Sequence, residues 1–169
     1  NYVLKWQDKS VNNMDAVATA VPQRPIYSAT EKGIYFQGDD DVLTSGNVGH
    51  GADSTITIFV VARLDTGMMA TRSTLITKGE GTNVPYQIYY RASKEEMVIN
   101  KNILGKKEMF NKHILAFSYE DQYTSTFYNG EWQAPVYAAY YAEPEPLMLG
   151  ARLNNGVILD YFKGMIHEV

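Results

Sequence analysis

Two pairs of acidic residues stand at positions i and i+2, the spacing at which side chains of one strand share a face: Asp39/Asp41 and Glu143/Glu145. Glycoside hydrolysis needs two carboxyl groups about 5 to 9.5 Å apart in a sugar-binding cleft. The aspartates follow a glycine in a turn-like segment and the glutamates alternate with prolines, so neither pair lies on an alternating strand. The sequence therefore predicts a protein that is not an enzyme. A divergent glycoside hydrolase, with two carboxylates facing a groove, stays as a third hypothesis.

Metal and nucleophile chemistry have few candidates in this chain. It has no cysteine, its three histidines lack metal-ligand spacing, and it has neither a Gly-x-Ser-x-Gly elbow nor a phosphate-binding glycine loop. Asp39, Asp40 and Asp41 form the best oxygen cluster for calcium, but aspartates after a glycine are also ordinary turn residues. We therefore expect a turn at 39–41 and no cofactor, with calcium as the alternative.

Aromatic residues offer a different chemistry, which is the binding of sugars. Sugar rings stack on exposed aromatic side chains, while polar groups beside the ring hold the hydroxyls. The chain has 13 tyrosines and 2 tryptophans, and tyrosine is also common in the packed faces of sheets. Core packing and ligand binding therefore both stay open for the candidate ligand-binding residues, which are Trp132, Tyr137, Tyr140, Tyr141, Tyr89 and Tyr90.

The elements that must position these residues are strands. Residues 112–132 read KHILAFSYEDQYTSTFYNGEW and predict a β-meander with a turn at 120–122 and a second turn at Asn129-Gly130. The Asn-Gly pair suits a two-residue type I′ turn because both turn positions need a positive φ. Among the side chains of the meander, Phe117, Tyr119 and Phe127 are expected in the core.

The remaining strands are predicted from period-two alternation, since no window shows helical periodicity. Residues 55–65 are apolar on both faces, which predicts a central strand that is covered on both sides. In the last strand, Glu168 shares a face with the apolar Ile166, and we expect a bulge or a partner for the carboxylate to resolve this conflict. Further strands are expected at 33–37, 73–78, 86–91, 95–100, 147–153 and 162–169. Roughly ten short strands without helices predict an all-β fold, an antiparallel two-sheet jelly-roll sandwich.

Composition limits the partners. At 169 residues the chain is predicted to form one domain, 1–169, in which 1–30 is an irregular edge segment. The net charge of −4 argues against nucleic acid as a partner, and no apolar run is long enough to insert into a membrane. The chain begins with Asn1 rather than methionine, so we expect it to be part of a longer polypeptide.

Several short motifs, in this order, resemble the laminin-G-like, concanavalin A-like jelly-roll superfamily of lectins and glucanases, particularly its bacterial and phage modules. The motifs are FQGDDDVL at 36–43, FVVAR at 59–63, YNG at 128–130, LGAR at 149–152 and FKGMIHEV at 162–169. The resemblance covers nearly the whole chain and implies two stacked antiparallel sheets whose first and last strands lie close together. It does not imply an activity, because this fold carries lectins, hydrolases, adhesion modules and virion parts.

These observations leave two leading functions. The first is a non-catalytic recognition module that binds a glycan or a protein at a cell or virion surface, outside the cell. The second is a structural virion or surface-assembly module, such as a capsid decoration or tail-associated domain, that buries aromatic surfaces against neighbours or in a homo-oligomer.

Overall fold

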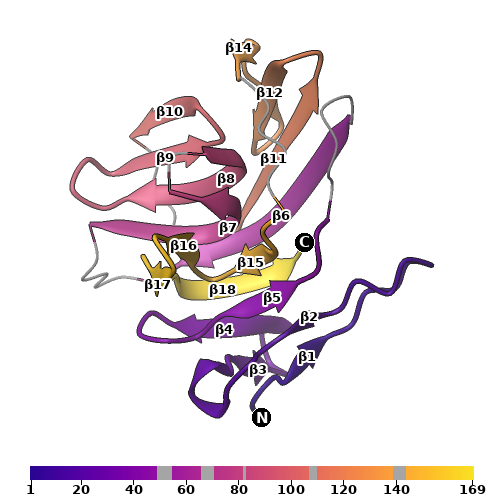
Figure 1. The fold of residues 1–169 in the computed structure, drawn as a ribbon. Helices are drawn as coiled ribbons and strands as arrows, with labels where there is room; N and C mark the ends of the chain where they lie inside the picture. Colours follow the sequence, from indigo (N-terminus) through magenta and orange to yellow (C-terminus); the bar gives the residue numbers. More distant parts are fainter. Residues whose placement is uncertain (49–54, 66–70, 82, 107–109, 139–143) are drawn as a thin grey trace.

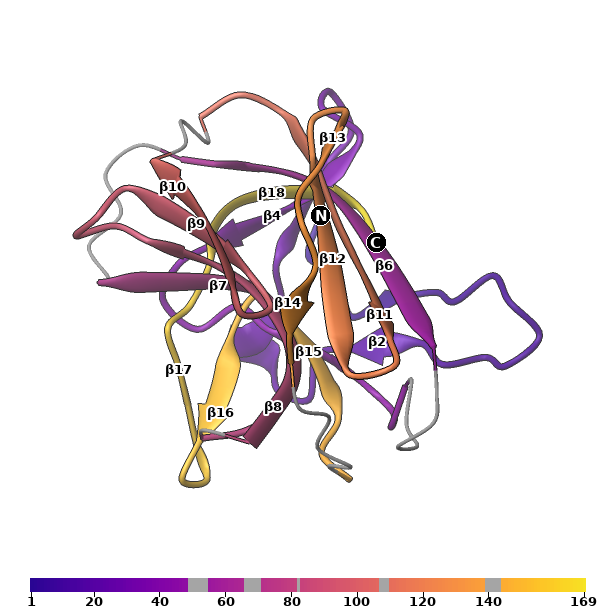
Figure 2. The same cartoon turned by 90° about the horizontal axis from the view of Figure 1, so that it is seen from above.

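The computed structural model describes residues 1–48, 55–65, 71–81, 83–106, 110–138 and 144–169, and these form an all-β sandwich (Figures 1 and 2). Within them, 18 strands build two sheets, and the one helical element is the 3-10 turn η1 (Val21–Gln23). No described segment is a helix long and apolar enough to cross a membrane. The predicted all-β, two-sheet sandwich is confirmed.

The first sheet has ten strands and carries the candidate site discussed below. Its strands follow the order β1-β2-β5-β15-β7-β8-β9-β10, and the hairpin β16–β17 adjoins β7. Their bounds are β1 (Lys5–Trp6), β2 (Ala16–Val17), β5 (Leu43–Ser45), β15 (Leu147–Leu149), β7 (Arg72–Glu80), β8 (Asn83–Arg91), β9 (Glu96–Ile99), β10 (Asn102–Lys106), β16 (Arg152–Asn154) and β17 (Val157–Leu159).

The second sheet has eight strands in the order β13-β12-β11-β6-β18-β4-β3, with β14 paired to β12. Their bounds are β13 (Glu131–Trp132), β12 (Tyr123–Tyr128), β11 (His113–Glu120), β6 (Ile56–Leu64), β18 (Lys163–Glu168), β4 (Gly33–Gln37), β3 (Ile26–Ser28) and β14 (Val136–Tyr137). The segment 1–30 contributes edge strands to both sheets, β1 and β2 to one and β3 to the other.

The hydrophobic core lies between the sheets. Val60, Ala62 and Leu64 of β6 are almost fully buried and pack in one cluster with the inward side chains of β8 and β11. Tyr86 and Phe117 bring the two sheets into direct contact, with ring centroids 5.7 Å apart. Burial of alternate residues on facing sheets is the main source of stability in such a sandwich.

The predicted meander is present, with two turns that place their residues at positive φ. Asp121 and Gln122 have φ of 49° and 66°, and Asn129 and Gly130 have φ of 46° and 99°. This confirms the two-residue turn at Asn129-Gly130.

The core predictions for the meander are correct for β11 and wrong for β12. Phe117 and Tyr119 are buried, but Phe127 is only half-buried and packs edge-on against Trp132 with ring centroids 5.3 Å apart. The register Leu115↔Tyr128 and Ala116↔Phe127 explains the difference, because it places Phe127 on the outer face of the sheet.

Two further expectations concern β6 and β18. The expectation that both faces of β6 are covered is wrong for its outer face, where Phe59 is 54% exposed. The expected bulge in β18 is confirmed: its register with β6 shifts between Ile166 and Glu168, and Glu168 is exposed.

The strand expected at 147–153 is split into β15 and β16, since Gly150 has φ of 88° and lies against the ring of Phe36.

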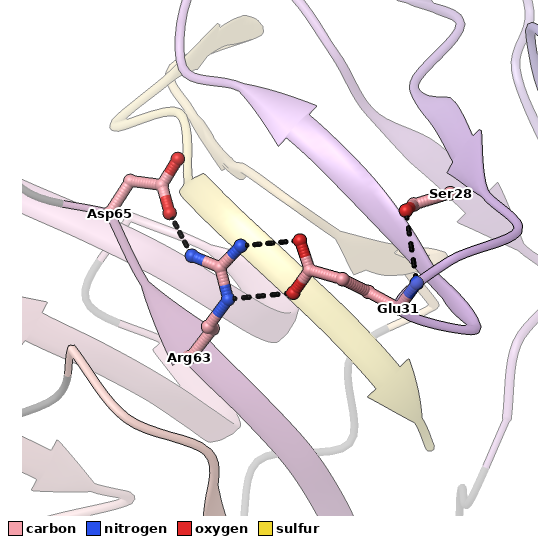
Figure 3. A network of polar contacts seen from close by, with 4 residues as sticks. All are labelled: Ser28, Glu31, Arg63 and Asp65. Atoms are coloured by element: carbon pink, nitrogen blue, oxygen red, sulfur yellow. Dashed lines mark hydrogen bonds and ion pairs between the residues drawn. The ribbon is translucent and has the colours of Figure 1, made fainter.

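A charged clasp ties β6 to the turn between β3 and β4 across the outer face of β18 (Figure 3). Arg63 donates to both carboxylate oxygens of Glu31, at 3.1 and 2.8 Å, and also binds Asp65. Ser28 fixes the turn, because its hydroxyl oxygen accepts the backbone N–H of Glu31 at 3.2 Å. These bidentate bonds lower the pKa of Glu31.

Replacement of Gly164 should test how tightly β18 and β6 approach. A Cβ at this position would meet the carbonyl oxygen of Arg63 at 2.2 Å, and φ is 151°. We expect Gly164→Ala to lower the free energy of unfolding by about 3 kcal/mol or more, measured by urea denaturation. Gly156→Ala, also at positive φ but with open space around its Cβ position, should cost about 1 kcal/mol. Equal losses for the two variants would contradict the close approach.

The clasp should make stability depend on pH in the acid range. Because Arg63 lowers the pKa of Glu31 in the folded chain from its ordinary 4.5, its contribution is present above pH 4.5 and is lost as pH falls through the lowered pKa. Thermal melting of Glu31→Gln should therefore converge with that of the unaltered chain at low pH. Glu120→Gln, at the exposed last position of β11, should parallel the unaltered chain throughout.

Candidate functional site

Alternation along β8 divides its side chains between the core and the outer face of the ten-stranded sheet. Tyr86, Ile88 and Tyr90 are buried in the core, so Tyr89 and Arg91 lie on the outer face. The neighbouring strands bring charged residues to the same place, because Arg72 of β7 and Glu96 of β9 both pair with Arg91.

A register shift in β7 is needed for this arrangement. Thr74 pairs with Tyr89 but Ile76 pairs with Ile88, so two steps along β7 match one step along β8 and Leu75 is the extra residue. Without this bulge, strict alternation would place Arg72 on the same face as Ile76, inside the core. The bulge turns the guanidinium of Arg72 to the outer face.

The guanidinium of Arg72 lies over an aromatic ring. Its guanidinium carbon lies 3.6 Å from the centroid of the Tyr89 ring, and its Nη2 donates to the side-chain oxygen of Gln87. A guanidinium over a tyrosine face is a cation–π contact, which becomes stronger where water is partly excluded. Burial, followed by the nearby charge of Arg152, lowers the pKa of Arg72 to about 10.

The β16–β17 hairpin adds a third arginine and a carboxylate. Nε of Arg152 donates to Oδ2 of Asp160 at 2.5 Å, and the same oxygen lies 3.6 Å from Nε of Arg72. The backbone carbonyl of Asp160 accepts the N–H of Thr74 at 2.9 Å, which fixes the hairpin against β7. We name Arg72, Tyr89, Arg91, Glu96, Arg152 and Asp160 the arginine cluster.

Several guanidinium nitrogens of the arginine cluster have no protein partner among the described residues. Its three arginines are balanced by only two carboxylates, since Glu96 binds Arg91 at 3.1 Å and Asp160 serves the other two. The side chains of these three arginines and two carboxylates are 18–26% exposed. Within the described part of the chain, both Nη atoms of Arg152 and one Nη atom each of Arg72 and Arg91 have no protein partner. Such guanidinium groups are suited to planar, bidentate binding of a carboxylate.

The aromatic residues proposed from the sequence do not form one platform. Tyr89 lies in the arginine cluster, whereas Tyr90 is 6% exposed in the core and is removed from the candidate platform. Trp132 and Tyr137 are exposed on the opposite side of the sandwich, where they pack against Phe127 and Tyr123. Tyr140 and Tyr141 lie outside the described residues.

Sequence reasoning missed the arginines and Asp160. One signal was available, since Arg91 stands two residues after Tyr89 on an alternating strand and must share its face. Arg72 could not be assigned in the same way because its face depends on the bulge at Leu75. Arg152 and Asp160 reach the site through the packing of a hairpin that is remote in the sequence.

The acidic residues considered for catalysis or calcium have structural contacts. Asp41 is fully buried, its Oδ2 accepts the N–H of Gln37 at 2.7 Å, and burial raises its pKa. Asp39 accepts the N–H of Asp40 at 3.0 Å, as expected for a turn. Among the residues that the structure describes, no three His, Asp or Glu side chains are grouped so that they could hold a metal ion. Glu143, of the second acidic pair, lies outside those residues.

No protein-family model and no curated protein sequence matches this chain. Solved structures with a similar fold include a sialidase from Trypanosoma rangeli, with 15% sequence identity, a TM-score of 0.59, and coverage of 96% of this chain and 28% of the sialidase. This chain therefore spans little more than a quarter of that protein.

Two smaller proteins are similar over most of their own length. The CBM40 module of the Ruminococcus gnavus IT-sialidase, bound to alpha2,3 sialyllactose, has 15% identity and a TM-score of 0.57, with 80% of this chain and 86% of the module covered. The alginate lyase from Corynebacterium sp. has 12% identity and a TM-score of 0.58, with 89% and 81% covered. At these identities the similarity shows the fold alone, a β-sandwich shared by carbohydrate-binding modules and carbohydrate-active enzymes.

Asp160 should be the electrostatic support of the arginine cluster. Asp160→Asn would leave Arg72 and Arg152 facing each other without a shared anion, so we expect a loss of about 1 to 2 kcal/mol in the free energy of unfolding. Asparagine tolerates the φ of 56° at this position. Asp121→Asn, at a φ of 49° in an exposed turn, is the matched control and should change stability little. Urea denaturation at low and high salt measures both, and an equal effect of the two substitutions would refute this role.

Proposed function

We propose that this chain is a non-catalytic recognition module that binds a carboxylate-bearing glycan at the arginine cluster. The observation that carries the proposal is Arg72, which lies over the Tyr89 ring beside two further arginines with unused guanidinium donors. A sugar carboxylate would accept paired N–H bonds from these guanidinium groups, and the sugar hydroxyls would bind the remaining donors and acceptors.

In this site Tyr89 has a positioning role. One face of its ring is covered by the Arg72 guanidinium at 3.6 Å, so that face is not available for stacking a sugar. Instead, the ring and Gln87 fix the orientation of Arg72 before a ligand arrives. An arginine that is already ordered loses less side-chain entropy on binding, and this favours affinity.

The similar structures support glycan recognition as the general class. One is a carbohydrate-binding module bound to sialyllactose, another is a sialidase solved in complex with sialic acid, and a third is an alginate lyase. Sialic acid and alginate are both carboxylated sugars, which agrees with the arginine-rich composition of the proposed site.

We infer binding without catalysis from the contacts of the carboxylates in the arginine cluster. Asp160 and Glu96 are each engaged in ion pairs with arginine, so neither is free to serve as the proton donor that a glycosidase needs. Since the sandwich resembles both modules and enzymes, this proposal rests on the site and its bonding.

The second candidate function is a structural module of a surface or virion assembly, of the laminin-G-like kind found in bacteria and phages. It is favoured by the outer face of the eight-stranded sheet, where Phe59, Ala116, Phe127 and Trp132 stand in one row across four strands. Phe59 and Trp132 are 54% and 56% exposed, so this row could be buried against a neighbour. Both functions place the protein at a cell or virion surface.

Isothermal titration with sialyllactose, alginate oligosaccharides and neutral lactose tests the proposed function. We expect binding of at least one acidic glycan, no binding of lactose, and weaker affinity at high salt, because the interaction is a charged one near the surface. Calcium and chelator should give equal affinities.

Substitutions then assign the site. Arg72→Ala and Arg72→Lys should each weaken binding about tenfold or more, since lysine keeps the charge but lacks the planar fork. Lys94→Gln, which removes one positive charge from the exposed β8–β9 turn, is the matched control and should bind normally. Blank titrations with every acidic glycan, or an unaltered affinity of Arg72→Ala, would reject the proposal.

A further inference from the structure

The sequence contains two Asn-Gly pairs, and each forms a hairpin turn in a different sheet. Asn129-Gly130 joins β12 to β13, and Asn155-Gly156 joins β16 to β17 (Figure 2). Both are two-residue turns, because the residues that flank each pair are directly opposite one another. The φ angles are 46° and 99° in the first turn and 50° and 72° in the second. The same local chemistry therefore stands in two different surroundings.

An asparagine followed by glycine can lose its side-chain amide. The backbone nitrogen of the glycine attacks Cγ of the asparagine, the Cγ–Nδ2 bond breaks, and Nδ2 leaves as ammonia with the proton that the backbone nitrogen gives up. Water then opens the cyclic imide and leaves aspartate or isoaspartate. Glycine permits the attack because it has no side chain to block the approach. Water is the one co-reactant that this deamidation needs.

The contacts of Asn129 oppose this reaction. Its side-chain oxygen accepts the N–H of Ile114 at 2.9 Å, and its side-chain nitrogen lies 2.5 Å from Nδ1 of His113. Both ends of the amide are engaged, so the amide must leave these contacts before its Cγ can meet the nitrogen of Gly130. The loss of two hydrogen bonds adds to the activation barrier.

The surroundings of Asn155 favour the reaction. Asn155 is exposed, and within the described part of the chain its side chain has no hydrogen-bond partner. The N–H of Gly156 donates to Oε1 of Glu80, the last residue of β7. A carboxylate at this place is within reach of the proton that must leave as the nitrogen attacks, which is the geometry of a general base. A Cβ added at Gly156 would meet no atom within 4 Å, so the turn has room to rearrange.

We propose that Asn155 is a site of spontaneous deamidation, at which Glu80 takes the proton from the backbone nitrogen of Gly156. The product has a new carboxylate close to that of Glu80, and the two like charges repel. Isoaspartate also adds a carbon to the backbone of the turn. Both changes weaken the attachment of the hairpin to β7, which includes the bond from Gly156 to Glu80 and the bond from the N–H of Gly81 to the carbonyl of Leu153. The inference does not depend on the proposed glycan.

Peptide mapping by mass spectrometry tests the proposal on the intact chain after incubation at neutral pH. We expect the peptide that contains Asn155 to gain the mass of deamidation about tenfold or more faster than the peptide that contains Asn129. In urea that unfolds the chain, the two peptides should react at similar rates, because the contacts that distinguish the turns are lost. Amide hydrogen exchange at Gly81 should be faster in the deamidated chain than in the unaltered one.

Substitutions assign the role of the carboxylate. Glu80→Gln keeps an acceptor for the N–H of Gly156 but cannot take its proton, so deamidation of Asn155 should slow about tenfold or more. Glu131→Gln, which neutralises an exposed carboxylate next to the other turn, is the matched control and should leave both rates unchanged.

The comparison of the two turns needs no substitution, so the test stays valid if a variant fails to fold. The proposal is overturned by equal rates at Asn155 and Asn129 in the folded chain, by a difference that persists in urea, or by an unaltered rate in Glu80→Gln. Unchanged hydrogen exchange at Gly81 after deamidation would overturn the loosening of the hairpin.

Discussion

The β-bulge at Leu75 is the constraint on which the candidate site depends. It lets Leu75 and Ile76 be fully buried, while Arg72 and Thr74, only a few residues earlier, lie on the outer face. A strand without the bulge would have to bury a guanidinium or expose an isoleucine, and both choices cost free energy. The same bulge brings Arg72 over Tyr89, so packing of the core and geometry of the site are coupled through one extra residue.

The two outer faces of the sandwich differ in chemistry. The ten-stranded sheet carries arginines and carboxylates around Tyr89, with the β16–β17 hairpin fixed beside them by the backbone bond from Thr74 to Asp160. The eight-stranded sheet instead carries a row of apolar side chains, of which Phe59 and Trp132 are exposed, and on its other half the Arg63 clasp that crosses β18. The charged cluster and the apolar row therefore lie on opposite sides of one small sandwich.

Local patterns were sufficient to predict the fold and its turns. The alternation of β6, β8 and β11 follows from period-two burial. The turn at Asn129-Gly130 follows from the residue types, because asparagine and glycine both tolerate a positive φ. The site needed information that is not local. The face of Arg72 depends on a bulge inside a stretch with no break in its pattern, and Asp160 meets Arg72 only after the hairpin packs on β7. The expectation that Phe127 lies in the core fails for a similar reason, since its face is set by its register with β11.

We propose that a carboxylated glycan binds at the arginine cluster and not at the exposed aromatic face. Nuclear magnetic resonance of the nitrogen-15-labelled chain measures this directly, because arginine Nε–H and tryptophan indole N–H signals report on the two sides separately. On titration with sialyllactose, we expect the signals of Arg72, Arg91 and Arg152 to shift and saturate together while the indole signal of Trp132 stays in place. A saturating shift of Trp132 with the three arginine signals unchanged would contradict it.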